Sequence, residues 1–274
     1  MMMQLLCLWI GQLLLLLVAT YELLQLLWHR LQAFAHRSYD YWQCDRRQQN
    51  NRLLFERTIR ELEKLPKHLV LVIGADERYV DASQLQRIFG YAQLVGIPYL
   101  SVYDARSVKN GYVDIGRFCQ WSKDRLYYWP SQKQNKQQIL EQNGNNKCVN
   151  ANGRTIGELQ VFQINALLDG HALIAKLCRE LYVNRGTTEV QQLLTKRELL
   201  SDKLNERLNQ ELGIPVPEPE LGIVFSGVTC TFGLLPWHAR FTEFHTHPSG
   251  RHFDATCFAQ LLYKYARCEQ RWGK

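Results

Sequence analysis

The sequence predicts an α/β domain with a parallel sheet flanked by helices, preceded by one N-terminal transmembrane helix. The first observation is an almost continuously apolar run over residues 5–27. The second is a strand pattern, a helix pattern and another strand pattern within residues 68–104, which form a βαβ unit and therefore two parallel strands. The third is that strand and helix patterns continue from there to the C-terminus.

The apolar run reads LLCLWIGQLLLLLVATYELLQLL and is long enough, as a helix, to cross a hydrocarbon core. A cleaved signal peptide begins with a basic region, but residues 1–10 contain no Lys or Arg. By the positive-inside rule, basic residues after the run place the downstream chain in the cytosol. We therefore expect an uncleaved anchor over residues 1–28, with a surface-bound amphipathic helix as the alternative. The basic residues are Arg30, Arg37, Arg46, Arg47 and Arg52.

A polar connector follows over residues 29–66. Leu53, Leu54, Ile59 and Leu62 recur at nearly helical spacing, and Pro66 cannot continue a helix. The connector therefore includes an amphipathic helix that ends before Pro66.

The domain over residues 67–274 opens with the βαβ unit. HLVLVIG, residues 68–74, is a short apolar run typical of a buried parallel strand. A helical stripe follows, with Asp81 or Ser83 as the N-cap and Gly96 as the C-cap. The second strand covers residues 97–104.

The rest of the domain continues the alternation. Residues 127–150 are rich in Gln and Asn and predict a polar insertion. Two further strands are predicted at 158–165 and 221–227. Helices are predicted at 112–125, at 169–185, at 187–213 with a break near Ser201, after Pro236 and Trp237 with Glu243 inside it, and at 258–270.

Composition narrows the classes of partner. The net charge of +7 and pI of about 9.0 favour anionic partners, but no basic run alternates with aromatics as nucleic-acid binding would require.

None of the eight Cys forms a C-x-x-C pair, which favours free thiols. Nucleophile-elbow and nucleotide-binding Gly motifs are absent. His245, His247 and His252 could form a metal site, but their spacing is loose, so we interpret them as exposed loop residues.

Two segments leave alternatives open. Ser226, Gly227 and Thr229 follow a predicted strand, where they either bind a ligand or simply form a turn. The C-terminal CEQRWGK ends in Arg271 and Gly273, which suit a helix end. The same pair also suits phosphate binding, because Arg presents a planar fork of donors and Gly lets a backbone N–H approach closely.

Four segments resemble, in order, the cis-prenyltransferase family, and within it the non-catalytic accessory subunits of dehydrodolichyl diphosphate synthase. They are HLVLVIG, GIPYLSVYD, LLPWHARFTEF and YARCEQRWGK, and the resemblance covers residues 66–274. It implies a required subunit of a heteromeric enzyme that makes long-chain polyprenyl diphosphate for dolichol synthesis and protein glycosylation. It also implies a single-pass protein of the endoplasmic reticulum membrane with its domain in the cytosol.

The chain departs from the catalytic members at two positions. Their first strand ends in an Asp that binds magnesium, where this chain has Gly74, and Asp76 is expected to point elsewhere. Their Arg-rich stretch, which binds isopentenyl diphosphate, is replaced by Phe225 and SGVTCTF. We therefore expect an inactive pocket, with Mg²⁺ bound mainly by a catalytic partner. Glu243 aligns with a metal-associated Glu and is a weak candidate ligand.

The resemblance gives the C-terminal tail a role in another subunit. It implies that Arg271 and Gly273 reach the partner's active site and contact the diphosphate of isopentenyl diphosphate, while Trp237 packs at the dimer interface. The partners would be the catalytic subunit, isopentenyl and polyprenyl diphosphates, and the membrane. The alternatives are a membrane receptor or scaffold that binds protein ligands, and an active homomeric synthase.

Overall fold

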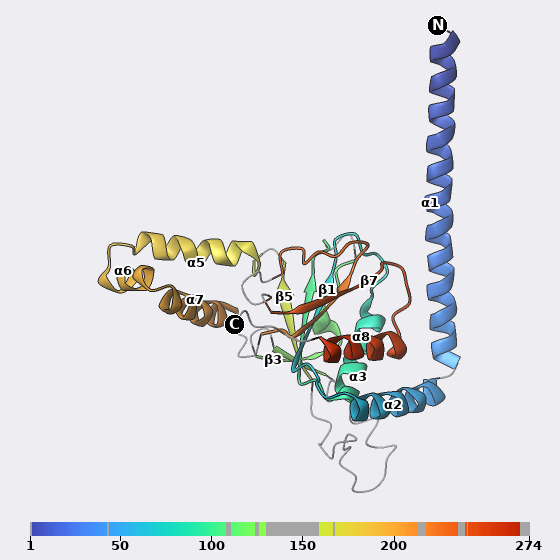
Figure 1. Ribbon diagram of the computed structural model, residues 1–274. Helices are drawn as coiled ribbons and strands as arrows, with labels where there is room; N and C mark the ends of the chain where they lie inside the picture. Colours follow the sequence, from blue (N-terminus) through green and yellow to red (C-terminus); the bar gives the residue numbers. More distant parts are fainter. Residues whose placement is uncertain are drawn as a thin grey trace. The chain divides into compact units, whose positions relative to one another are not determined.

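A computed structural model describes residues 2–42, 44–107, 111–123, 126–129, 159–166, 168–212, 218–234, 239 and 241–268. The chain divides into two compact units. The first comprises residues 1–50 and 250–252, and the second comprises residues 51–249 and 253–274. Figure 1 labels their helices and strands.

The first unit is dominated by one long helix, α1, over Met2–Trp42. Within it, Cys7–Gln32 is long and apolar enough to cross a membrane, with a mean hydropathy of 1.8 and no buried residue in its most apolar window. The helix extends well beyond residue 28, the predicted end of the anchor. Length and composition thus agree with the expected span, while the boundary between anchor and connector stays a prediction.

The second unit is built on one sheet. In the described part of the chain it has seven strands in the order β3-β4-β5-β2-β1-β6-β7. From β5 to β7 every neighbouring pair is parallel, while β3 pairs with β4, and β4 with β5, in antiparallel fashion. The strands are β1 (His68–Ile73), β2 (Tyr99–Asp104), β3 (Gln120–Lys123), β4 (Leu126–Trp129), β5 (Leu159–Asn165), β6 (Leu221–Phe225) and β7 (Glu243–His247).

The parallel core confirms the predicted βαβ unit. All six residues of β1 are buried, as expected for a central strand with both faces covered. The helix α3 (Ala82–Val95) begins where Asp81 accepts a hydrogen bond from the Gln84 N–H, and it ends at Gly96, whose φ is 88°. A left-handed φ of this kind is favourable for Gly at a helix C-cap.

Two predicted helices are wrong. Residues 112–125 contain one 3₁₀ turn (Ile115–Arg117) and then β3, because β3 pairs with β4 at the sheet edge. Glu243 begins β7 rather than lying in a helix, because residues 243–247 pair in parallel with β6. His245 and His247 consequently lie in this strand and not in a loop. Most of the predicted insertion, from residue 130 onward, lies outside the described residues.

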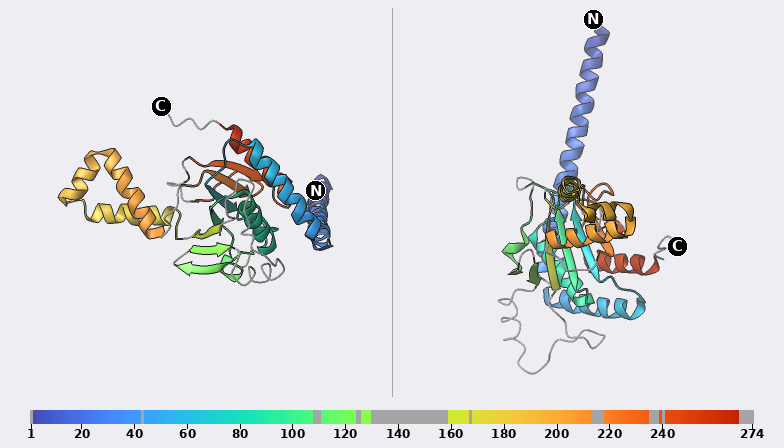
Figure 2. Two further views of the ribbon diagram at one scale, coloured as in Figure 1. Left: turned by 90° about the horizontal axis from the view of Figure 1, so that it is seen from below. Right: turned by 90° about the vertical axis from the view of Figure 1, so that its left-hand side faces the viewer.

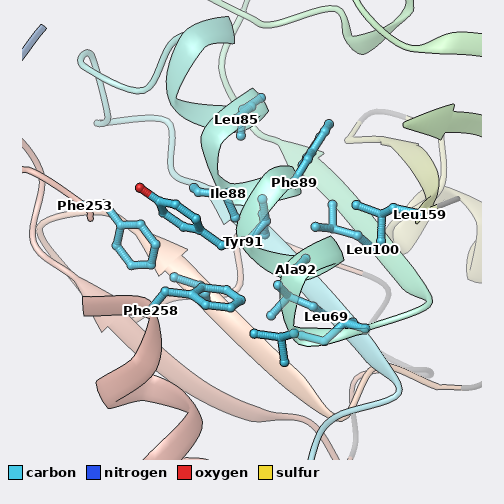
Figure 3. Close-up of a cluster of buried hydrophobic side chains, with 14 of the residues drawn as sticks. Leu69, Leu85, Ile88, Phe89, Tyr91, Ala92, Leu100, Leu159, Phe253 and Phe258 are labelled. Atoms are coloured by element: carbon cyan, nitrogen blue, oxygen red, sulfur yellow. The ribbon is translucent and has the colours of Figure 1, made fainter. Parts of the chain in front are cut away.

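In the part of the chain that the structure describes, three helices pack on one face of the sheet and share its main apolar core. They are α2 (Cys44–Glu61), whose end precedes Pro66 as predicted, α3 and α8 (Ala255–Arg267). Figure 3 shows part of this core, including Leu85, Ile88 and Phe89 of α3. Phe258 of α8 meets Phe55 of α2 and Tyr91 of α3, with ring centroids 5.9 Å apart in both pairs. Full burial of one such aromatic side chain contributes about 1.5–3 kcal/mol. These rings therefore fix α2 and α8 side by side (Figure 2).

The opposite face of the sheet carries a second core. It joins Val70, Val72 and Val224 of the sheet to Leu173 of α5 (His171–Val183) and Leu208 of α7 (Arg197–Leu212). The helices α5, α6 (Thr188–Thr195) and α7 extend from the sheet as an arm (Figure 1). The predicted break in this helical region is confirmed, but it falls at Lys196 rather than near Ser201.

Candidate functional site

The candidate site lies where β1 and β6 end side by side. Ile73 is in register with Phe225, and the Gly74 N–H donates to the Phe225 carbonyl at 2.9 Å. Ligands of open α/β sheets bind outside the carboxyl ends of parallel strands. The segments after these two strands, residues 74–81 and 226–234, therefore lie where a ligand is expected to bind.

The carboxylate of Asp76 joins these two segments. Its oxygens lie 2.8 and 3.0 Å from the Ser226 Oγ, which donates to them, and Oδ2 accepts the Gly227 backbone N–H at 2.7 Å. The Val228 N–H donates to the Ser226 Oγ at 3.1 Å and so fixes the hydroxyl. Asp76 therefore points at the turn after β6 and is held there by hydrogen bonds within the chain.

These contacts determine the ionisation of Asp76. Burial acts to raise the pKa of the carboxyl group, but hydrogen bonds from Gly227 and Ser226 favour the charged form and lower it. The net result is a pKa below the ordinary 3.8, so Asp76 is an anion at neutral pH.

Gly74 is too crowded to carry a side chain. A Cβ placed there would lie 2.5 Å from Asp76 Oδ1 and 2.8 Å from two ring carbons of Phe232. Phe232 itself has a φ of 51°, a strained conformation for a residue with a side chain. The Tyr103 hydroxyl holds it by donating to the Phe232 carbonyl at 2.6 Å. The space beside Gly74 is thus filled by Asp76 and Phe232.

The other acids of residues 74–81 also have partners within the chain. Glu77 accepts the Tyr79 N–H at 2.5 Å and the Val80 N–H at 3.3 Å, and Asp81 caps α3. The Val80 carbonyl in turn accepts a hydrogen bond from Arg106 at 2.9 Å. The segment is therefore held in place by its own carboxylates and by Arg106.

Arg106 is held by a buried ion pair with Asp104, at the end of β2. Their closest N–O distance is 2.7 Å, and the two side chains are only 1% and 0% exposed. Asp104 also accepts the Val113 N–H at 3.0 Å. This pair fastens three segments to one another: the segment after β1, the end of β2 and the start of the 3₁₀ turn.

These strand ends do not fit a magnesium site. Gly74 provides no ligand at the position of the catalytic Asp, and the Asp76 carboxylate already accepts hydrogen bonds on both oxygens. Among the residues that the structure describes, no group of three or more His, Cys, Asp or Glu side chains could hold a metal ion.

Glu243 is the first residue of β7 and lies at the amino ends of the parallel strands, opposite the ends near Asp76. Its Oε1 is 2.7 Å from His245 Nε2, and its carboxylate raises the pKa of the neighbouring Cys268 thiol. Beside it, Glu220 accepts the Lys67 N–H at 2.6 Å and the Tyr265 hydroxyl at 3.3 Å. The role of Glu243 as a metal ligand stays a prediction. The length of the strands lies between Glu243 and Asp76.

The same contacts show where α8 ends. Because Tyr265 and Cys268 lie beside Glu220 and Glu243, the helix ends at the amino edge of the strands. Its first turn lies at the other edge, where the ring of Phe253 meets those of Phe225 and His247 at centroid distances of 5.3 and 5.0 Å. Cys268, the last described residue, therefore lies at the end of the strands away from Asp76.

Two curated proteins are similar to this chain over most of its length. The chain is 26% identical over 229 residues to the mouse (Mus musculus) dehydrodolichyl diphosphate synthase complex subunit Nus1, covering 81% of this chain and 71% of that protein. It is 27% identical over 226 residues to the human (Homo sapiens) NUS1 subunit, covering 78% of this chain and 69% of that protein. Most of the chain is therefore similar to the Nus1 subunits.

No protein-family model matches this chain. A crystal structure of a probable undecaprenyl diphosphate synthase from Campylobacter jejuni aligns with 77% of this chain and 100% of its own length, at 12% identity and a TM-score of 0.38. The function proposed below therefore rests on the similarity to the Nus1 subunits.

Three predicted site residues of this chain lie outside the described residues, namely Arg271, Gly273 and Trp237. Their assigned roles remain predictions. The contacts of Asp76 were not predicted, because from the sequence Asp76 was considered only as a replacement for the missing Asp. Its partner Ser226 is 150 positions away, and only the adjacency of β1 and β6 brings the two together.

Proposed function

We propose that the chain is the accessory subunit of a heteromeric cis-prenyltransferase that makes long-chain polyprenyl diphosphate for dolichol synthesis and protein glycosylation. The observation that carries the proposal is the similarity to Nus1 subunits over about four-fifths of the chain, with most of their length included. The catalytic subunit of this complex is the expected partner, and isopentenyl and polyprenyl diphosphates are the expected substrates and products.

The strand ends support an accessory rather than an independent role. A catalytic pocket must bind diphosphate groups and the cation that neutralises them. In this chain Gly74 lacks a side chain, the Asp76 carboxylate binds Ser226 and Gly227, and Phe232 covers Gly74. In the proposal, the chain's own pocket is inactive and Mg²⁺ is bound mainly by the catalytic partner.

In the proposed mechanism, Arg271 and Gly273 bind the diphosphate of isopentenyl diphosphate in the partner's active site. The isopentenyl double bond forms a bond to the allylic carbon as the allylic C–O bond breaks, so negative charge develops on the departing diphosphate. The isopentenyl unit then loses a proton to diphosphate or water, which restores a double bond. Two donors held near the diphosphates, the Arg271 guanidinium and the Gly273 backbone N–H, orient the incoming substrate and stabilise charge. The loss of one preorganised donor of this kind typically reduces the rate about 10²–10³-fold.

The helix α1 would tether the complex to the endoplasmic reticulum membrane, with the domain in the cytosol. Cys7–Gln32 has the length and composition of a span, and basic residues such as Arg46 and Arg47 follow it. A polyprenyl chain is itself apolar, so synthesis at the membrane lets the growing product enter the bilayer.

The proposal is tested by co-expressing the full chain with a catalytic cis-prenyltransferase subunit and measuring isopentenyl incorporation in the purified complex. Arg271→Ala should lower the turnover about 10²–10³-fold while the two subunits still copurify. Arg267→Ala is the matched control, because Arg267 is an exposed Arg in the last turn of α8. Unchanged turnover in Arg271→Ala would refute the tail's role, and failure to copurify with any catalytic subunit would refute the subunit itself.

The orientation is tested separately, on sealed microsomes. Protease added outside the vesicles should digest the domain, because the proposal places it on the cytosolic side. Protection of the domain until detergent is added would contradict the cytosolic orientation and would favour a receptor facing the lumen.

A further inference from the structure

We propose that a basic surface formed by α2 and α8 docks on an anionic phospholipid membrane. This surface, the basic ridge, consists of Arg57 and Arg60 of α2, Lys64 just after α2, and Lys264 and Arg267 of α8. The inference goes beyond the proposed function and rests on one part of it, the membrane tether formed by α1.

The first argument is the concentration of charge. Residues 51–67 and 255–268 hold seven Lys or Arg and three Glu, a net charge of +4 out of the +7 of the whole chain. The remaining 243 residues together carry only +3. Clusters of about four to eight basic residues that follow a membrane span, or lie on an amphipathic helix, attract anionic lipid headgroups.

The second argument is that packing brings these charges onto one surface. The helices α2 and α8 lie side by side (Figure 2), and the Tyr263 hydroxyl of α8 donates to the Glu61 carboxylate of α2. Arg57 pairs with the same Glu61 at 2.9 Å, and its side chain is 81% exposed. Lys64 lies over the Tyr265 ring, with Nζ 4.2 Å from the ring centroid. The basic residues of α2 therefore border the two basic residues of α8.

The third argument is the pattern of α2 itself. Phe55 and Ile59 point into the core, whereas Leu53, Arg57 and Arg60 are exposed. Leu53 is 59% exposed and lies one turn before Arg57 and two turns before Arg60, on the outward side of the helix. An apolar residue among basic ones is typical of helices that lie in the membrane interface. Leu53 can therefore enter the acyl boundary while the two Arg side chains stay at the headgroups.

The fourth argument selects a membrane over other anionic partners, and it is proximity along the chain. Arg52 follows Gln32, the end of the candidate span, by 20 residues. As helix, such a stretch measures about 30 Å, and both α1 and α2 contribute helix to it. The basic ridge is thus tethered within a short reach of lipid headgroups, so a weak interaction per charge is sufficient for docking.

The test uses the full chain in lipid nanodiscs, made either of phosphatidylcholine alone or with about 30% phosphatidylserine. Acetylation by an N-hydroxysuccinimide ester reports how accessible each Lys side chain is, and peptide mass spectrometry reads each site. Lys264 and Lys64 report on the basic ridge. Lys196, an exposed residue between α6 and α7, is the reference.

Two double variants separate the basic ridge from net charge. The ridge variant combines Arg57→Gln with Arg60→Gln and leaves both reporter Lys residues in place. The arm variant combines Arg179→Gln with Arg185→Gln, which removes the same charge from exposed positions in and after α5.

We expect phosphatidylserine to slow the acetylation of Lys264 at least about threefold relative to Lys196. This protection should disappear at about 1 M NaCl, where the Debye length falls to about 3 Å. The ridge variant should lose most of the protection, because each basic residue contributes roughly a fivefold factor to binding at an anionic membrane. The arm variant should keep it.

Equal acetylation of Lys264 in the two lipids overturns the inference, as does an equal slowing at Lys196. Protection that requires added catalytic subunit and occurs in neutral nanodiscs also overturns it, because the basic ridge would then bind protein. The main assay contains no catalytic subunit and measures no turnover, so failure of the subunit role does not alter its result. A chain that stays with phosphatidylserine nanodiscs but dissociates from phosphatidylcholine nanodiscs would refute the α1 span while supporting the basic ridge.

Discussion

Gly74 and Phe232 are packed so closely that a Cβ at Gly74 would come within 2.8 Å of two carbons of the Phe232 ring. Gly74→Ala should therefore destabilise the domain by about 1–3 kcal/mol through overpacking. Phe232→Ala in the same chain should recover part of this loss, because the two residues are in contact and their effects are not additive. Urea denaturation of the four chains measures the coupling.

Gly90 is the control for Gly74→Ala. It lies inside α3, and no atom lies within 4 Å of the position that its Cβ would take. Gly90→Ala should stabilise the domain by about 0.5–1 kcal/mol, because Gly is unfavourable in a helix interior. A Gly74→Ala chain that is as stable as the unmodified chain would show that the close packing at Gly74 does not hold in solution.

The buried pair Arg106–Asp104 predicts a large effect from a single substitution. Arg106→Met removes the partner of a carboxylate that is fully buried and should cost about 3–5 kcal/mol. Lys176→Met is the comparison, because the Lys176–Glu211 pair has the same 2.7 Å separation but exposed side chains. Its denaturation midpoint should hardly change. Similar midpoints for the two variants would contradict the structural role of Arg106.

Asp76 predicts a specific dependence of stability on pH. Its pKa is lower in the folded chain than the ordinary 3.8, so its stabilising contribution is complete at neutral pH and is lost as the pH falls through the folded-state pKa. Asp76→Asn should therefore be less stable than the unmodified chain at pH 7 and pH 5. The two denaturation midpoints should converge below about pH 4. A constant gap down to pH 3 would refute the lowered pKa.

Cysteine reactivity tests the packing around the 3₁₀ turn. Burial raises the pKa of Cys119 to about 12, so the folded chain presents almost no thiolate there at pH 7. Cys178 and Cys230 are exposed. Maleimide at pH 7 should label Cys178 and Cys230 within minutes, while Cys119 should react only after denaturation. Peptide mass spectrometry reads each site separately, and fast labelling of Cys119 would contradict its burial.

Local sequence patterns were sufficient for the central part of the fold. The run 68–74 predicted β1 because both faces of that strand are covered, so nearly every residue is apolar. Asp81 and Gly96 predicted the ends of α3 because capping depends on residues within one turn. The lead-in helix α2 was predicted for the same reason, from the spacing of Leu53, Leu54 and Ile59.

Long-range pairing accounts for what the patterns missed. Residues 120–123 form an edge strand only because β4 lies beside them, and Glu243 begins a strand only because residues 243–247 pair with β6. The link from Asp76 to Ser226 depends likewise on β1 and β6 being neighbours. A signal was present in the sequence, since Asp76 follows the first strand and Ser226 the later one, but nothing local shows that those strands are adjacent.

The opposite orientation of α8 and the strands has an evolutionary consequence. The helix runs from the carboxyl ends of the strands, near Phe225 and His247, to their amino ends, near Glu220 and Glu243. Substitutions at the carboxyl ends of the strands leave the surroundings of Cys268 untouched, because the length of the strands separates the two places. The two ends of one sheet can therefore change independently during evolution.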